Sequence, residues 1–182
     1  MKKILIVVDM QVDFVSGSLG SADAEQIVAG VCARIERAKA DGETVLLTLD
    51  THAGDYLSTQ EGEKLPVLHC VSGTPGWMLD PRVAKALDPG MPMFEKNTFG
   101  SEALGRFLAR MAQSAGAPDG KGLEIELCGL CSDICVISNA LLIKATLPEA
   151  ELSVDARLCA GVTPASHEAA LSVMRTCQIE IR

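Results

Sequence analysis

The chain of 182 residues is long enough for one α/β domain with a sizeable core, and we expect residues 1–182 to form a single domain. Its formal net charge of −8 excludes the basic surface that nucleic-acid binding requires, and no apolar run reaches the roughly 18 residues that cross a bilayer. The seven cysteines, an odd number without an export signal, indicate reduced thiols in a cytoplasmic protein.

Short β-branched runs alternate with longer amphipathic segments, a pattern typical of a parallel sheet covered by helices on both faces. Strands are expected, in chain order, at residues 3–9, 43–50, 91–95, 123–129, 151–155 and 178–182. Helices are expected at residues 24–40, 80–87, 101–113, 132–145 and 163–175. The alternation predicts an α/β fold with a helix layer on each side of the sheet.

The segment between Asp50 and Met91 breaks this rhythm. Only one short helical candidate, at residues 80–87, falls within it. Long irregular connections inside compact domains are usually functional. Because His52 and His69, two of the three histidines, lie in this segment, we expect it to contribute to a site.

Residues 129–139, Gly-Leu-Cys-Ser-Asp-Ile-Cys-Val-Ile-Ser-Asn, mark the point where a predicted strand turns into a predicted helix. A cysteine at such a turn lies near unpaired backbone N–H groups and the positive end of the helix dipole, and both stabilise a thiolate. Since the thiolate is the reactive form of cysteine, we interpret Cys135 as a nucleophile. Two alternatives remain: a buried structural cysteine, or a zinc-binding or redox module of Cys128, Cys131 and Cys135.

Polar residues follow three of the predicted strands: Asp9, Asp50 and Cys135. Because the carboxyl ends of parallel strands form the binding crevice of open α/β sheets, these side chains are expected to meet at one edge. Asp50, His52 and His69 offer one oxygen and two nitrogen ligands, a set that suits Zn²⁺ and also Mn²⁺ or Fe²⁺. For Asp50 and His52 alone, a capping aspartate beside a surface histidine is the alternative.

The chain resembles the isochorismatase-like cysteine hydrolases, and within them the nicotinamidase branch, in the order Asp9…Asp50-Thr51-His52…His69…Lys96…Cys135. Four collinear segments carry the resemblance, namely residues 8–14, 69–76, 94–96 and 129–136. They span nearly the whole chain. The resemblance implies a three-layer α/β/α fold with a six-stranded, mostly parallel, Rossmann-like sheet.

The resemblance further implies a catalytic triad of Asp9, Lys96 and Cys135 in an amidohydrolase that converts nicotinamide and water to nicotinate and ammonia. A thiol that attacks an amide needs a base for its proton and an acid for the departing amine. A partly desolvated Asp9, with a raised pKa, can do both in turn, while Lys96 offsets the negative charge. The family also implies a thioester intermediate, an oxyanion hole from the N–H groups of Cys131 and Cys135, and a cis peptide at Leu130–Cys131.

In this family the metal binds the pyridine nitrogen, which assigns Asp50, His52 and His69 to a metal site with zinc as the first choice. Glu61 is a candidate further ligand, and Glu63 competes with it for that position. The expected partner is a small-molecule amide, without nucleic acid or membrane. The resemblance also implies a homo-oligomer.

Phe14, Tyr56 and Leu130 are expected to line the substrate pocket. His167 lies in the first turn of a predicted helix and is expected to be a solvated surface residue. Residues 65–68, Leu-Pro-Val-Leu, are aliphatic where nicotinamidases commonly carry an aromatic residue. This departure leaves another small amide or a ureido compound as the alternative substrate.

Overall fold

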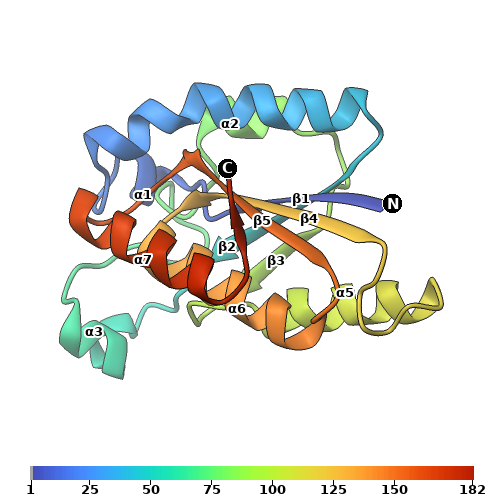
Figure 1. Ribbon diagram of the computed structural model, residues 1–182. Helices are drawn as coiled ribbons and strands as arrows, with labels where there is room; N and C mark the ends of the chain where they lie inside the picture. Colours follow the sequence, from blue (N-terminus) through green and yellow to red (C-terminus); the bar gives the residue numbers. More distant parts are fainter. Residues whose placement is uncertain (1) are drawn as a thin grey trace.

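A six-stranded sheet forms the centre of the protein, whose computed structural model describes residues 2–182 (Figure 1). All neighbouring strands are parallel, in the order β3-β2-β1-β4-β5-β6. The strands are β1 (Lys2–Val8), β2 (Thr44–Asp50), β3 (Met93–Lys96), β4 (Leu123–Leu130), β5 (Glu151–Ala160) and β6 (Glu180–Ile181). The predicted six-stranded α/β architecture is confirmed, and the sheet is parallel throughout.

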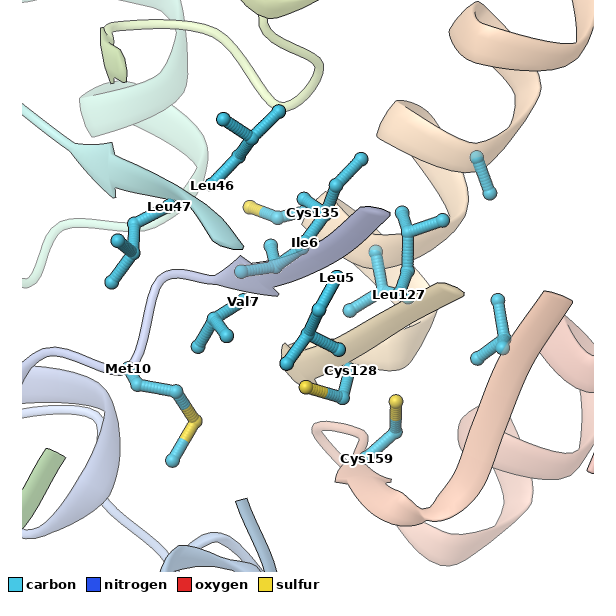
Figure 2. Close-up of a cluster of buried hydrophobic side chains, with 14 of the residues drawn as sticks. Leu5, Ile6, Val7, Met10, Leu46, Leu47, Leu127, Cys128, Cys135 and Cys159 are labelled. Carbon is cyan, nitrogen blue, oxygen red and sulfur yellow. The ribbon is translucent and has the colours of Figure 1, made fainter. Parts of the chain in front are cut away.

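The inner strands are apolar on both faces because helices cover both sides of the sheet. Residues 4–8 of β1 and 45–50 of β2 are buried without a break. Figure 2 shows side chains of β1 packed between Leu46 on β2 and Leu127 on β4. Along the chain, β2 and β3 are added on one side of β1, whereas β4, β5 and β6 are added on its other side. The direction of strand addition therefore reverses between the neighbours β1 and β4, which form a topological switch point. Ligands bind at such points in open α/β sheets.

Five main helices make the two outer layers (Figure 1). On one face lie α2 (Ala22–Ala40) and α4 (Pro81–Ala86), and on the other lie α5 (Glu102–Ser114), α6 (Ile137–Thr146) and α7 (Pro164–Thr176). Four of them begin at a side-chain cap, formed by Ser21, Asp80, Ser101 and Thr163. Within residues 2–182, no helix combines the length and apolar character that a membrane span needs.

Several elements differ from the sequence prediction. Three short ones have no predicted counterpart, namely α1 (Val12–Val15), a 3-10 turn (Tyr56–Ser58) and α3 (Gln60–Lys64). They are too short for apolar periodicity to reveal them. β5 continues to Ala160 instead of ending at residue 155, and the helix predicted at residues 132–145 begins with a π-helical turn, Ser132–Val136.

Candidate active site

Side chains from four separate segments meet at the carboxyl ends of the strands. Nζ of Lys96, the last residue of β3, lies 2.7 Å from Oδ2 of Asp9, which follows β1, and 3.5 Å from Sγ of Cys135. The same nitrogen lies 3.3 Å from Oδ1 of Asp50, the last residue of β2. All four residues are buried. The structure therefore brings together the three residues of the predicted triad and places Asp50 beside them.

Asp9 is held from two sides. Its backbone is left-handed, with a φ of 46°, a conformation that is found preferentially at functional sites when the residue is not glycine. The hydroxyl of Thr48 on β2 donates to Oδ1 of Asp9 at 2.6 Å. The ion pair with Lys96 lies outside hydrogen-bond alignment, so Oδ2 has no hydrogen-bond donor and stays available to accept a proton. The sequence analysis assigned no role to Thr48.

The turn after β4 has a tightly constrained backbone. Gly129 has a φ of 115°, and a Cβ there would lie 2.2 Å from the carbonyl oxygen of Val8. Only glycine fits this contact between β4 and β1. The following peptide, Leu130–Cys131, is cis, as the family resemblance implies. Gly129 and this peptide join the end of β4 to the π-helical turn that carries Cys135.

Asn139 anchors this turn from behind, a role that the sequence analysis did not identify. Its Nδ2 donates to the carbonyl oxygen of Cys135 at 2.8 Å, and its Oδ1 accepts from the N–H of Ser101 at 2.9 Å. Asn139 is fully buried. The one available signal was a polar residue four positions after the nucleophile, on the same side of the helix.

Burial governs the protonation of the cluster. It raises the pKa of Asp9, and the attraction of Lys96 offsets this only in part. Burial also raises the pKa of the Cys135 thiol well above its ordinary value, and the negative charge of Asp9 raises it further. Burial therefore acts against the thiolate that the turn was expected to stabilise. The thiol keeps its proton until a base removes it.

Asp50, His52 and His69 form a second group beside the triad. One potential ligand atom from each lies within 4.8 Å of the other two, and all three residues are buried. The Nε2 atoms of His52 and His69 lie 2.9 and 3.5 Å from Oδ2 of Asp50. Gln11 bonds to the N–H and the carbonyl of Asp50, at 2.7 and 2.8 Å. Nδ1 of His69 bonds to the carbonyl of Val67, which leaves its Nε2 facing the group.

These donors fit a divalent metal. Nε2 of His52 is buried without a hydrogen-bond partner, because its contact with Asp50 is short but not aligned as a hydrogen bond. An imidazole nitrogen in this state, facing a carboxylate and a second imidazole, is suited to metal ligation. Oε1 of Glu61 lies 3.8 Å from this nitrogen, whereas Glu63 is exposed. Of the two glutamates, Glu61 is thus the one near the group.

The alternative of a zinc cluster at Cys128, Cys131 and Cys135 finds no support. All seven cysteines are free thiols, and no potential metal group within residues 2–182 includes a cysteine. Cys128 is a core residue of β4 and lies near Cys159 of β5 (Figure 2).

A cavity of about 590 Å³ lies above the triad and the metal group. Phe14 and Leu130 line it, as do Cys131 and Cys135. The ring of Phe14 is centred 5.5 Å from that of His69, which places an aromatic face beside the metal group. Two of the three predicted wall residues therefore border the cavity.

Tyr56, the third predicted wall residue, lies behind the metal group instead. It is 1% exposed, and its ring is centred 4.5 Å from that of His52 and 4.9 Å from that of His69. Its hydroxyl donates to the carbonyl of Leu65. Tyr56 thus packs against the two histidines from the side away from the cavity.

His167 is not the solvated residue that its place in a first helical turn predicts. It is half-buried, and its Nδ1 lies 2.8 Å from Oγ of the fully buried Ser132. The contact joins α7 to the turn that carries Cys135. No sequence pattern indicated it, since the two residues lie 35 positions apart.

Comparisons with known proteins point to one family. The Isochorismatase domain model matches residues 3–182. A nicotinamidase/pyrazinamidase from Mycobacterium tuberculosis is 28% identical over 98% of this chain and 97% of its own length. The crystal structure of a nicotinamidase from Bacillus subtilis superposes with a TM-score of 0.82 at 25% identity, covering 100% and 99% of the two chains. That of a pyrazinamidase from Pyrococcus horikoshii in complex with zinc gives 0.79 at 26%, again over 100% and 99%.

These likenesses support a hydrolase of the nicotinamidase type that acts on an amide C–N bond. They confirm the resemblance that the order of motifs carried in the sequence. The chain belongs to the isochorismatase family.

Proposed function

We propose that this protein hydrolyses nicotinamide to nicotinate and ammonia through a thioester on Cys135. The observation that carries the proposal is the position of Lys96 Nζ, 2.7 Å from the Asp9 carboxylate and 3.5 Å from the Cys135 sulfur. One ammonium thus bridges the base and the nucleophile inside a buried site. This is the arrangement that covalent amide hydrolysis requires.

Asp9 moves the proton in both halves of the reaction. It takes the thiol proton as the sulfur attacks the amide carbon, and Lys96 holds the charged groups together. The N–H groups of Cys131 and Cys135 stabilise the oxyanion. Asp9 then returns the proton to the amine, the C–N bond breaks and ammonia leaves. Finally Asp9 takes a proton from water, which attacks the thioester carbon, and nicotinate departs as Cys135 regains its proton.

Asp50, His52 and His69 would hold a divalent metal, and zinc suits their one carboxylate and two imidazoles best. Glu61 is the candidate further ligand. When bound, the metal supplies a Lewis acid for the pyridine nitrogen and so orients the ring. Phe14 borders the same space with its ring. The carboxamide is then directed toward Cys135.

The surroundings of this reaction are also part of the proposal. Seven free thiols are stable in a reducing compartment, which supports a cytoplasmic protein. The substrate is a small molecule, and we assign the whole chain to one catalytic domain that assembles into a homo-oligomer, as the family resemblance implies. Size-exclusion chromatography with light scattering measures the assembly directly.

Ammonia release tests the function. The screen compares nicotinamide, pyrazinamide and ureido compounds, with and without a chelator, in the wild-type protein and in Cys135→Ala. We expect turnover of nicotinamide that Cys135→Ala abolishes while the circular dichroism spectrum stays the same. Turnover of ureido compounds alone would replace nicotinamide by the second candidate, which the aliphatic segment before His69 favours. Full activity of Cys135→Ala would exclude the covalent route.

A further inference from the structure

The cavity above Cys135 is larger and more aliphatic than a single pyridine ring needs. Its volume of about 590 Å³ falls in the range of sites that take drug-sized molecules. Besides Phe14, the apolar walls come from Leu19, Leu130, Ile134 and Val162. These residues lie on different segments and line the same cavity as Cys135.

Exposed apolar side chains gather at the mouth of this cavity. Leu65, Phe99 and Val162 are 36%, 48% and 62% exposed, and all three line it. They come from the segment after α3, the β3–α5 connection and the β5–α7 connection. Large apolar side chains from three separate segments around one opening indicate a binding surface rather than scattered exposure.

We propose that the preferred substrates are amides whose ring carries an apolar substituent, which extends from the ring site along this wall to Leu65, Phe99 and Val162. The inference rests on the proposed amide hydrolysis at Cys135. Two observations favour a substrate group as the occupant of the mouth. The apolar residues of the mouth line the same cavity as Cys135, and Leu65, in the aliphatic segment before His69, is one of them.

A series of nicotinamides with ring alkyl chains of increasing length tests this inference. Burial of each added methylene should raise kcat/KM about three- to fourfold until the chain reaches solvent. Val162→Ser and Leu65→Ser should remove most of this gain for the longer chains. Leu68→Ser is the matched control, because Leu68 is 49% exposed in the same segment but does not line the cavity. This control should keep the full gain.

The outcomes separate the two claims. If nicotinamide is turned over and kcat/KM falls as the alkyl chain of its analogues lengthens, the inference is overturned and the proposed function is left intact. Turnover of the alkylated amides without nicotinamide supports the inference and overturns the nicotinamide assignment. Absence of turnover throughout the series overturns both. Loss of the gain in Leu68→Ser as well as in Val162→Ser would show that the mouth does not bind the chain.

A different observation, the contact between Ser132 and His167, carries a second inference. Ser132 directly follows Cys131, a candidate oxyanion donor, and its hydroxyl is fully buried at 2.8 Å from Nδ1 of His167. The next residue, Asp133, accepts from the N–H of Val162 at 3.0 and 3.1 Å. Two consecutive residues of the turn are therefore tied to the segment that begins α7.

Gly161 makes this junction tight. A Cβ at Gly161 would lie 2.9 Å from Cβ of His167 and 3.0 Å from Oγ of Ser132. The geometry points to His167 as a positioning residue: by holding the Ser132 hydroxyl, it fixes the direction of the Cys131 N–H toward the oxyanion. This inference also rests on the proposed covalent hydrolysis. It predicts changes in rate only for variants of His167 and Ser132.

His167→Ala should lower kcat at least tenfold while KM changes less than twofold, since misdirecting one oxyanion donor costs up to about 10²–10³. His167→Asn, which keeps a hydrogen-bonding group at the Nδ1 position, should restore most of the rate. Ser132→Ala should match His167→Ala, and the double variant should be no slower than either. Ser166→Ala is the control, because it removes the capping bond from the N–H of Thr163 to the Ser166 hydroxyl in the same helical turn without touching Ser132.

Two reagents separate positioning from general damage. Iodoacetamide alkylates the Cys135 sulfur without forming an oxyanion, so its rate should be the same in His167→Ala and wild type. The Cys135 sulfur adds to the carbonyl carbon of nicotinaldehyde and an oxyanion forms. The binding of nicotinaldehyde should therefore be at least tenfold weaker in His167→Ala than in the wild type. Equal losses in both reactions, or an unchanged kcat, would overturn the inference. A wild-type protein that releases no ammonia would instead contradict the proposed function.

Discussion

Two buried groups of charges lie toward opposite ends of the sheet, and they differ in how their members are paired. At the carboxyl end, the carboxylates of Asp9 and Asp50 share the single ammonium of Lys96. Toward the amino end, the guanidinium of Arg34 on α2 donates to Glu126 on β4 at 2.6 Å and to Glu43 at 2.7 Å. In both groups two carboxylates share one buried cation, but the guanidinium donates an aligned hydrogen bond to each carboxylate, whereas the ammonium donates one to Asp50.

The difference separates reactivity from stability. The amino-end group joins a helix to the sheet with directed hydrogen bonds, and it contains no nucleophile. Buried polar atoms without a hydrogen-bond partner occur in both groups, namely Oδ2 of Asp9 and Nε2 of His52 at the carboxyl end and Nη1 of Arg34 at the amino end. The carboxyl-end group differs because the pKa values of Asp9 and of the Cys135 thiol beside it are raised. Buried groups with perturbed pKa values are typical of catalytic sites. The following predictions test this contrast, from the largest expected effect to the smallest.

Asp9→Asn should reduce kcat/KM by about 10³–10⁴, because loss of a general acid–base removes up to that factor. Its thermal unfolding temperature should not fall, since the substitution removes one of two carboxylates that share Lys96. Ammonia release and calorimetry measure the two effects. Loss of activity together with unfolding would place Asp9 among the stabilising groups.

Arg34→Met should lower the free energy of unfolding by about 3–5 kcal/mol, because Glu126 and Glu43 then stay buried without their partner. Urea denaturation measures this loss. The kcat of the folded fraction should equal that of the wild type. A large fall in kcat at full folding would mean that the two ends of the sheet are coupled.

Removal of metal should act on the carboxyl end alone. A ligand at a hundred times its dissociation constant stabilises the folded state by about 2.7 kcal/mol, so a chelator should lower the unfolding temperature of the wild-type protein accordingly. His52→Ala should bind little metal and be insensitive to the chelator. Arg34→Met should keep its metal in elemental analysis. Equal metal content in His52→Ala and wild type would contradict the assignment of the site.

Arg182→Ala should have the smallest effect, at most about 1 kcal/mol. Arg182 lies 3.4 Å from Glu126, but its side chain is 36% exposed and solvent screens the pair. Comparison with Arg34→Met in the same denaturation experiment separates burial from charge. A loss as large as that of Arg34→Met would show that the outer pair, not the inner one, carries the stability.

Part of the proposed catalytic and metal-binding group was predictable from local signatures. Asp9 and Asp50 lie at or just after predicted strand ends, and Cys135 follows a glycine-marked turn. Parallel strands bring such positions to one edge whatever their separation in sequence. Lys96 was assigned by the family resemblance.

The residues that support the site were not predictable in the same way. Thr48, Asn139 and His167 act through partners that are distant in sequence or buried behind the turn. The position of Tyr56 behind the histidines depends on a short 3-10 turn that leaves no periodic signal. The raised pKa of Cys135 reflects the depth of burial, which no local pattern encodes.

Mass spectrometry of the quenched reaction tests the central claim most directly. During turnover of nicotinamide, the account predicts a mass increase of one nicotinoyl group on the peptide that contains Cys135. The adduct should be absent from Cys135→Ala, and less of it should form at low pH, where protonated Asp9 cannot accept the thiol proton. Rapid ammonia release by the wild-type protein without any adduct, matched by equal release from Cys135→Ala, would contradict it.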